Sequence, residues 1–121
     1  MTGPLVCVVD DDESVRESLP GLVRAFGFTV VAFSSAEEFL AYDHVPQIGC
    51  LILDITMPGM SGPELQMELK RRKLHIPIVF ITAQKDETVR KSMLERGAVD
   101  CLFKPFSALE LREALKKAFR V

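Results

Sequence analysis

The apolar residues of the chain follow two alternating spacings. Some lie in short continuous runs, which are typical of buried parallel strands, and others recur every three or four residues, as on one face of a helix. The two spacings take turns along the whole sequence. This pattern predicts an α/β fold, in which a parallel sheet of five strands is covered on both faces by helices. The expected strands are 5–9, 28–33, 48–53, 76–81 and 99–103.

Capping residues mark where the expected helices begin and end. Asp12 and Asp86 are expected to cap the first and fourth helices, and Gly27 and Gly97 to end them. The other helices begin at capping boxes, in which a serine and a glutamate three residues later bind each other's backbone N–H groups. These pairs are Ser35 with Glu38, Ser61 with Glu64, and Ser107 with Glu110.

The sequence also predicts the course of the first helix and the ends of the second and third. Pro20 falls within the first helix, where proline costs about 3 kcal/mol, but the apolar stripe continues past it. We therefore expect a kinked but continuous helix. The second helix is expected to run to about Tyr42. The third is expected to end near the basic stretch 70–73, which suits the negative end of a helix dipole.

Length and composition limit the possible classes of protein. The chain has 121 residues, which suits one domain over residues 1–121. Its net charge of -2 offers no footprint for nucleic acid, so direct DNA binding is not expected. No apolar run is long enough to span a membrane, and residues 1–4 lead directly into a strand rather than a secretory signal. We expect a cytoplasmic protein.

The three cysteines are expected to serve the core. Cys7, Cys50 and Cys101 each fall within an expected strand and lack the close pairing of zinc sites. They are interpreted as small buried hydrophobes in a reducing compartment. A redox-sensing thiol is the alternative, but it would need an exposed and electropositive setting.

Charged residues gather where three of the expected strands end. Asp10 and Asp11 follow the first strand, Asp54 follows the third, and Lys104 follows the fifth. Because parallel strands end at one edge of a sheet, these side chains should meet in a crevice at its carboxyl side. Clustered carboxylates repel one another unless a cation or a proton intervenes, and a lysine beside them suggests an anion. Metal plus phosphate is the simplest chemistry that needs both.

The order of these motifs resembles that of the receiver domain of bacterial two-component response regulators, over the full length of the chain. The FixJ type is the most similar subfamily. The resemblance implies a doubly wound, flavodoxin-like fold with five helices and strand order 2-1-3-4-5. The motifs that carry it are Val9-Asp10-Asp11, Leu53-Asp54, Met57-Pro58-Gly59-Met60-Ser61-Gly62, Ile81-Thr82-Ala83, Ala98-Val99-Asp100 and Lys104-Pro105-Phe106.

The resemblance also implies roles for residues around Asp54. Asp54 corresponds to the phosphoacceptor, whose carboxylate attacks a phosphohistidine on a sensor histidine kinase. Asp11 corresponds to a direct Mg²⁺ ligand and Asp10 to a ligand that acts through water. Thr56 is expected to offer its backbone carbonyl to the ion, so that Asp10, Asp11, Asp54 and Thr56 form the metal site.

Further expectations concern the phosphoryl group and the response to it. Lys104 should neutralise phosphoryl oxygens, and the hydroxyl of Thr82 should donate to them. The Lys104-Pro105 bond is expected to be cis. The family's Tyr or Phe three residues before the lysine is replaced by Cys101, so coupling between Thr82 and the surface of the fourth helix should be looser.

The expected function is a phosphorylation-activated signalling switch and not an enzyme. Phosphorylation should remodel the face made by the fourth helix, fifth strand and fifth helix. The expected partners are a sensor histidine kinase, a DNA-binding output domain carboxyl-terminal to this chain, and a second copy in a phosphorylation-dependent homodimer through the fourth helix and fifth strand. The mixed apolar and charged set that favours this homodimer is Val89, Lys91, Glu95 and Val99.

Other functions remain open at this stage. One alternative is a single-domain receiver that acts by protein contacts alone. Another is a phosphatase of the haloacid dehalogenase type with Asp54 as nucleophile, although the general acid expected two positions later is Thr56 here. A nucleotide or flavin site needs glycines after the first strand, where this chain has three aspartates. A plain interaction module would not need the carboxylates.

Overall fold

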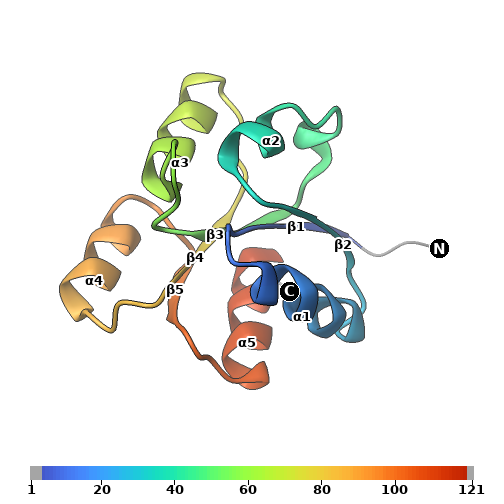
Figure 1. Ribbon diagram of the computed structural model, residues 1–121, viewed down its shortest axis with the longest axis vertical. Coiled ribbons are helices and arrows are strands. Elements are labelled where there is room, and N and C mark those ends of the chain that lie inside the picture. The colour runs from blue at the N-terminus through green and yellow to red at the C-terminus, as the bar shows by residue number, and fades with distance from the viewer. Residues whose placement is uncertain (1–3, 120–121) are drawn as a thin grey trace.

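The computed structural model describes residues 4–119. Residues 1–3 and 120–121, at the two ends of the expected domain, lie outside the described residues. Most of residues 1–4, for which the sequence predicted no secretory signal, therefore lies outside them too. Helices surround a central sheet in Figure 1. The elements are β1 (Leu5–Val9), α1 (Glu13–Ala25), β2 (Thr29–Phe33), α2 (Ala36–Leu40), the 3-10 helix η1 (Val45–Gln47), β3 (Cys50–Asp54), α3 (Gly62–Arg71), β4 (Ile78–Thr82), α4 (Glu87–Glu95), β5 (Asp100–Phe103) and α5 (Ala108–Phe119).

The five strands form one parallel sheet in the order β2-β1-β3-β4-β5. This confirms the predicted fold class and strand order. The register aligns Val9 with Leu53, Asp54 with Ile81, and Thr82 with Phe103. The strands therefore end at nearly the same level, which brings the residues at their carboxyl ends to one edge.

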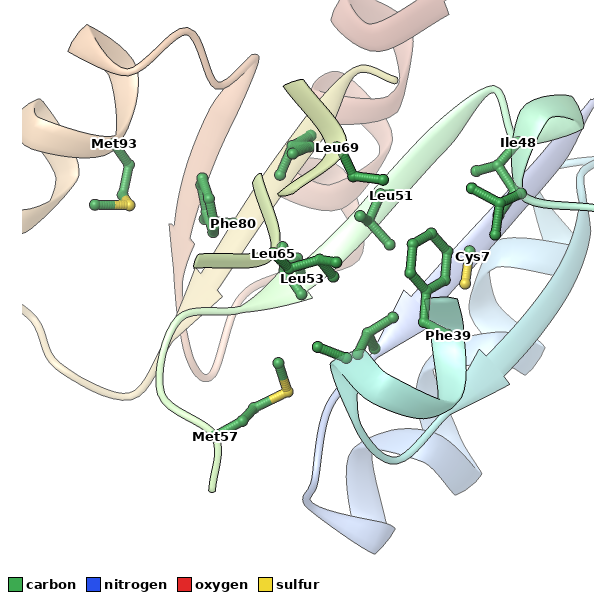
Figure 2. Close-up of a cluster of buried hydrophobic side chains, with 14 of the residues drawn as sticks. Cys7, Phe39, Ile48, Leu51, Leu53, Met57, Leu65, Leu69, Phe80 and Met93 are labelled. Carbon is green, nitrogen blue, oxygen red and sulfur yellow. The ribbon is translucent and has the colours of Figure 1, made fainter. Parts of the chain in front are cut away.

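Helices cover both faces of the sheet and enclose two apolar cores. Side chains of α2, α3 and α4 pack on one face, where Phe39, Leu65 and Met93 meet alternate residues of the strands (Figure 2). Side chains of α1 and α5, including Leu19 and Leu111, pack on the other. All five residues of β3 are buried, as expected for the central strand. Alternation along each strand thus supplies both cores at once.

The helix boundaries follow the predicted caps with one difference. Asp12, Asp86 and the capping box of Ser61 with Glu64 act as predicted. Ser107 and Glu110 also bind each other's N–H groups reciprocally. At α2 the Ser35 hydroxyl accepts the Glu38 N–H, but the Glu38 carboxylate accepts the N–H of Ser34 instead of Ser35. The capping box there is therefore only half formed.

Several boundaries differ from the prediction by one or two residues. The helix expected to reach Tyr42 ends at Leu40, although the Tyr42 N–H still donates to the Phe39 carbonyl in a turn, and η1 follows with Pro46 in its first turn. Helix ends commonly shift by this much. Strand β4 begins at Ile78, just after Pro77, because proline has no N–H for the sheet. Helix α1 continues through Pro20 as predicted, and its kink stays a prediction.

The three cysteines are buried free thiols, as predicted. Burial raises the pKa of Cys50 to about 12 and that of Cys101 to about 11, and burial also raises the pKa of Cys7. Such thiols carry little thiolate and react slowly.

Within residues 4–119, no helix is long and apolar enough to cross a membrane.

Candidate functional site

The predicted site residues converge at the carboxyl edge of the sheet. Asp10 directly follows β1, Asp54 is the last residue of β3, Thr82 is the last residue of β4, and Lys104 directly follows β5. Asp10 is completely buried, and Asp54 and Thr82 are 6% and 2% exposed. The sequence predicted that Asp54 would follow the third strand, but Asp54 is the last residue of that strand. The strand fixes the direction of its carboxylate.

Lys104 lies between two of the carboxylates. Its ammonium donates to Oδ2 of Asp10 at 2.8 Å and lies 3.7 Å from Oδ1 of Asp54. The backbone holds the lysine in place, because its N–H donates to the Thr82 carbonyl at 2.8 Å. The Lys104-Pro105 peptide bond is cis, as predicted. The nearest partner of the lysine is therefore Asp10.

Asp10 is held by contacts on both carboxylate oxygens. Its Oδ1 accepts the N–H of Asp12 at 2.9 Å, while Oδ2 accepts the lysine. Its backbone carbonyl accepts a hydrogen bond from the Arg16 guanidinium at 3.0 Å. Asp11, by contrast, is exposed. With both oxygens already bonded, Asp10 is better suited to reach an ion through water than directly.

The donor set fits a small, hard cation. One carboxylate oxygen from each of Asp10, Asp11 and Asp54 lies within 4.8 Å of the others. Mg²⁺ binds oxygen ligands at 2.0–2.1 Å in octahedral geometry and keeps several waters. Three carboxylates at this spacing, one of them exposed to solvent, match that requirement. The structure thus brings together the three acidic ligands expected from the sequence.

The environment of Asp54 favours its protonated form. Burial, followed by the neighbouring charge of Asp10, raises the pKa of this carboxyl to about 7 in spite of the opposing charge of Lys104. A hydrogen bond and charge repulsion from Asp11 act in the same raising direction. For Lys104, burial alone would lower the pKa, but the hydrogen bond to Asp10 and the charge of Asp54 outweigh it and raise the pKa. A cation beside Asp54 would relieve the repulsion.

Without divalent metal, the contribution of Asp54 to the free energy of unfolding should fall as pH rises from about 4 to about 7. The Asp54 carboxyl has a pKa of about 7 when folded and an ordinary value of 3.8. The folded state thus binds more protons in this range and loses that advantage as pH increases. Urea titrations in EDTA should show that Asp54→Asn removes about 2–4 kcal/mol of this fall. Identical pH profiles for both proteins would contradict the shifted pKa.

Thr82 and Thr56 occupy different surroundings. The Thr82 hydroxyl accepts the N–H of Gln84 at 3.1 Å, which leaves its own proton available for a ligand. Thr56 lies exposed on the loop after β3, two residues beyond Asp54. The roles of the Thr82 hydroxyl as a donor and of the Thr56 carbonyl as a metal ligand stay predictions.

Two contacts around the site were not foreseen from the sequence. Arg16 reaches back from α1 to the Asp10 carbonyl, and Glu37 on α2 binds the backbone of Met60 on the loop after Asp54. Both residues are charged positions on short or amphipathic helices, where a solvent-exposed side chain is the ordinary interpretation. The sequence carries no local signal that would have identified them.

Comparison with known families gives one match over most of the chain. The family described as "Response regulator receiver domain" matches this chain over residues 6–116. The matched range includes all the predicted site residues from Asp10 to Lys104.

Individual relatives agree with this match. Nodulation protein W of Bradyrhizobium diazoefficiens is 45% identical over 117 residues, covering 97% of this chain and 52% of its own length. Transcriptional regulatory protein FixJ of Rhizobium meliloti is 40% identical over 118 residues, covering 98% of this chain and 58% of its own. The crystal structure of FixJ-N superposes with a TM-score of 0.86 at 38% identity, covering 99% of this chain and 96% of that one. The chain spans about half the length of the curated relatives it matches.

Proposed function

The chain belongs to the family of response regulator receiver domains, and from this premise we propose that residues 1–121 form one phosphoacceptor domain with Asp54 as the acceptor. Receiver domains are phosphorylation-activated signalling switches. The observation that carries the assignment is the position of Asp54. Its carboxylate ends the central buried strand and lies beside the carboxylates of Asp10 and Asp11, with the Lys104 ammonium 3.7 Å from its Oδ1.

In the proposed step, a carboxylate oxygen of Asp54 attacks the phosphorus of a phosphohistidine. The new bond joins that oxygen to phosphorus, and the bond between phosphorus and the imidazole nitrogen breaks. The imidazole leaves with the bonding electron pair. The strand holds the nucleophile, so catalysis is largely a matter of position and charge neutralisation.

The acidic cluster fits Mg²⁺, with Asp11 and Asp54 as direct ligands, Asp10 through water and Thr56 through its carbonyl. When bound, the ion neutralises negative charge on the carboxylates and on the phosphoryl oxygens. Lys104 supplies a second positive charge for those oxygens, and Thr82 donates its hydroxyl proton to one of them. The short bond between Lys104 and Asp10 supports this role because it holds the ammonium beside Asp54.

An enzymatic function finds no support in the site. A phosphatase that used Asp54 as nucleophile would need an acid two residues later, and Thr56 has no proton at a suitable pKa to give. The comparisons show a signalling domain instead. We therefore assign the chain no substrate turnover beyond assisting its own phosphorylation and dephosphorylation.

Partners follow from the proposed switch. We propose a sensor histidine kinase as the phosphoryl donor and a DNA-binding output domain carboxyl-terminal to this chain, in a cytoplasmic transcription regulator. The greater length of the relatives and the name of transcriptional regulatory protein FixJ support a regulator with a further domain. A groove of about 290 Å³ lies on the face of α4, β5 and α5, where Cys101 replaces a bulky ring. Asp100 beside it pairs with Arg90 of α4 and Lys117 of α5. We assign to α4 and β5 a phosphorylation-dependent homodimer, which light scattering with beryllofluoride would detect.

Acetyl phosphate tests the switch without a kinase. With Mg²⁺ present, intact mass spectrometry should show the gain of one phosphoryl group that is lost on standing or in hydroxylamine. EDTA should prevent the gain. A chain that takes up no phosphoryl group at any Mg²⁺ concentration would contradict the proposed function.

Mg²⁺ affinity should depend strongly on Asp11. Asp11→Ala removes one ligand and one negative charge from an exposed position, so the fold should be little affected. We expect at least about tenfold weaker Mg²⁺ binding by calorimetry, as for the loss of one carboxylate ligand. Glu13→Ala, two residues away, is the matched control and should bind Mg²⁺ as the wild type does. Equal affinity in Asp11→Ala and wild type would remove Asp11 from the metal site.

A further inference from the structure

Two contacts hold the base and the first half of the loop between β3 and α3, residues 55–61. The Gly62 N–H donates to the Ile55 carbonyl at 3.0 Å, which closes the loop at its base. The Met57 side chain is 6% exposed and joins the apolar cluster beside α2, as Figure 2 shows. Thr56 between these anchors is exposed and makes little packing contact. In the far half of the loop, the Met60 side chain packs against the same cluster and the Ser61 N–H donates to the Glu64 carboxylate, and the Met60 backbone has one further support.

That support comes from a different part of the sequence. Oε2 of Glu37, in the first turn of α2, accepts the N–H of Met60 at 3.0 Å across a separation of 23 residues. The same oxygen lies 2.9 Å from the point where a Cβ on Gly59 would stand, and Gly59 has a φ of 73°. The carboxylate thus rests against a left-handed turn, where the absence of a side chain leaves room for it. A bond from a backbone N–H to a carboxylate is charge-assisted.

We propose that Glu37 is a positioning residue that sets the backbone of loop 55–61 and, through it, the Thr56 carbonyl at the acidic cluster. The inference rests on the proposed function, which places Mg²⁺ at that cluster. Met60 is four residues from Thr56 on the same short loop, and Met57, next to Thr56, is anchored by its buried side chain. Mg²⁺ demands near-ideal octahedral geometry, so a small displacement of one oxygen ligand weakens binding.

The decisive comparison uses three variants. Glu37→Ala removes the acceptor, Glu37→Gln keeps an acceptor oxygen but removes the charge, and Glu13→Ala removes a charge from an exposed position at the same edge of the sheet. Two quantities are measured in each: the hydrogen-exchange rate of the Met60 amide by NMR, and Mg²⁺ affinity by calorimetry. We expect Glu37→Ala to speed Met60 exchange and to weaken Mg²⁺ binding about three- to tenfold. Glu37→Gln and Glu13→Ala should stay within about twofold of the wild type.

The outcomes separate position from charge. Equal weakening in all three variants would mean that Glu37 acts only through its charge, and would overturn the proposal. Faster exchange of the Met60 amide with unchanged Mg²⁺ affinity would also overturn it, because the loop would then be free to move without consequence. A wild-type chain that binds no Mg²⁺ would defeat the proposed function and this inference with it, whereas normal Met60 protection in Glu37→Ala would defeat the inference alone.

Discussion

Asp54→Asn is expected to take up no phosphoryl group from acetyl phosphate, whereas the wild-type chain should take up one. The amide has no nucleophilic oxygen anion. Asp10 is also buried beside Lys104, but both of its carboxylate oxygens already accept hydrogen bonds, from the Asp12 N–H and from the Lys104 ammonium, so it is the poorer nucleophile. The fold should survive, because Asn occupies nearly the same volume and removes the repulsion that raises the pKa of Asp54. Intact mass spectrometry after incubation with Mg²⁺ measures the result.

The matched control is Asp86→Asn. This residue caps α4, away from the cluster, and Asn caps a helix as well as Asp does. It should be labelled like the wild type. Undiminished labelling of Asp54→Asn would mean that another residue accepts the phosphoryl group.

The second large effect is expected for Gly62→Ala. A Cβ at this position would lie 2.4 Å from the backbone carbonyl oxygen of Asp54 and 3.1 Å from the Phe80 ring. Neither the phosphoacceptor's own backbone nor a fully buried ring can give way easily. We expect about 1–3 kcal/mol of destabilisation in urea titrations, as for overpacked core positions, together with much slower labelling.

Gly21→Ala provides the control for this substitution. A Cβ at Gly21 meets nothing within 4 Å, and the residue lies exposed in α1. Alanine there should stabilise the chain by about 0.5–1 kcal/mol because it restricts the unfolded state and favours the helix. Wild-type stability and labelling in Gly62→Ala would show that the loop after Asp54 can shift without effect.

The fold could be predicted because most of its signals are local. Apolar runs and helical repeats gave each element, and the capping pairs fixed the helix starts. One error lies where a neighbouring residue changes the local preference, because Pro77 delays the start of β4. Helix α2 ends at Leu40 instead of Tyr42, and β3 spans Cys50–Asp54 instead of 48–53, because spacing alone does not fix the last residues of an element. The half-formed box at Ser35 arises because Glu38 reaches one residue further back, a choice between two adjacent N–H groups that spacing alone cannot decide.

The candidate site also has features that could be predicted from the sequence and features that could not. Asp10, Asp54 and Lys104 could be placed together from sequence because strand ends of a parallel sheet share one edge. Their pairing could not, since Lys104 binds Asp10 more closely than Asp54. Arg16 and Glu37 went unnoticed because their partners are backbone groups on other elements, and backbone groups leave no mark in the sequence.

The most direct test of the phosphoacceptor role is to locate the phosphoryl group. The wild-type chain is incubated with acetyl phosphate and Mg²⁺ and then reduced with borohydride, which converts an aspartyl phosphate to homoserine. Peptide mass spectrometry then identifies the modified residue. Homoserine at position 54 alone is the predicted result. Homoserine at another aspartate, or a phosphoryl group on a serine or threonine that survives reduction, would contradict the assignment of Asp54 as the acceptor of this switch.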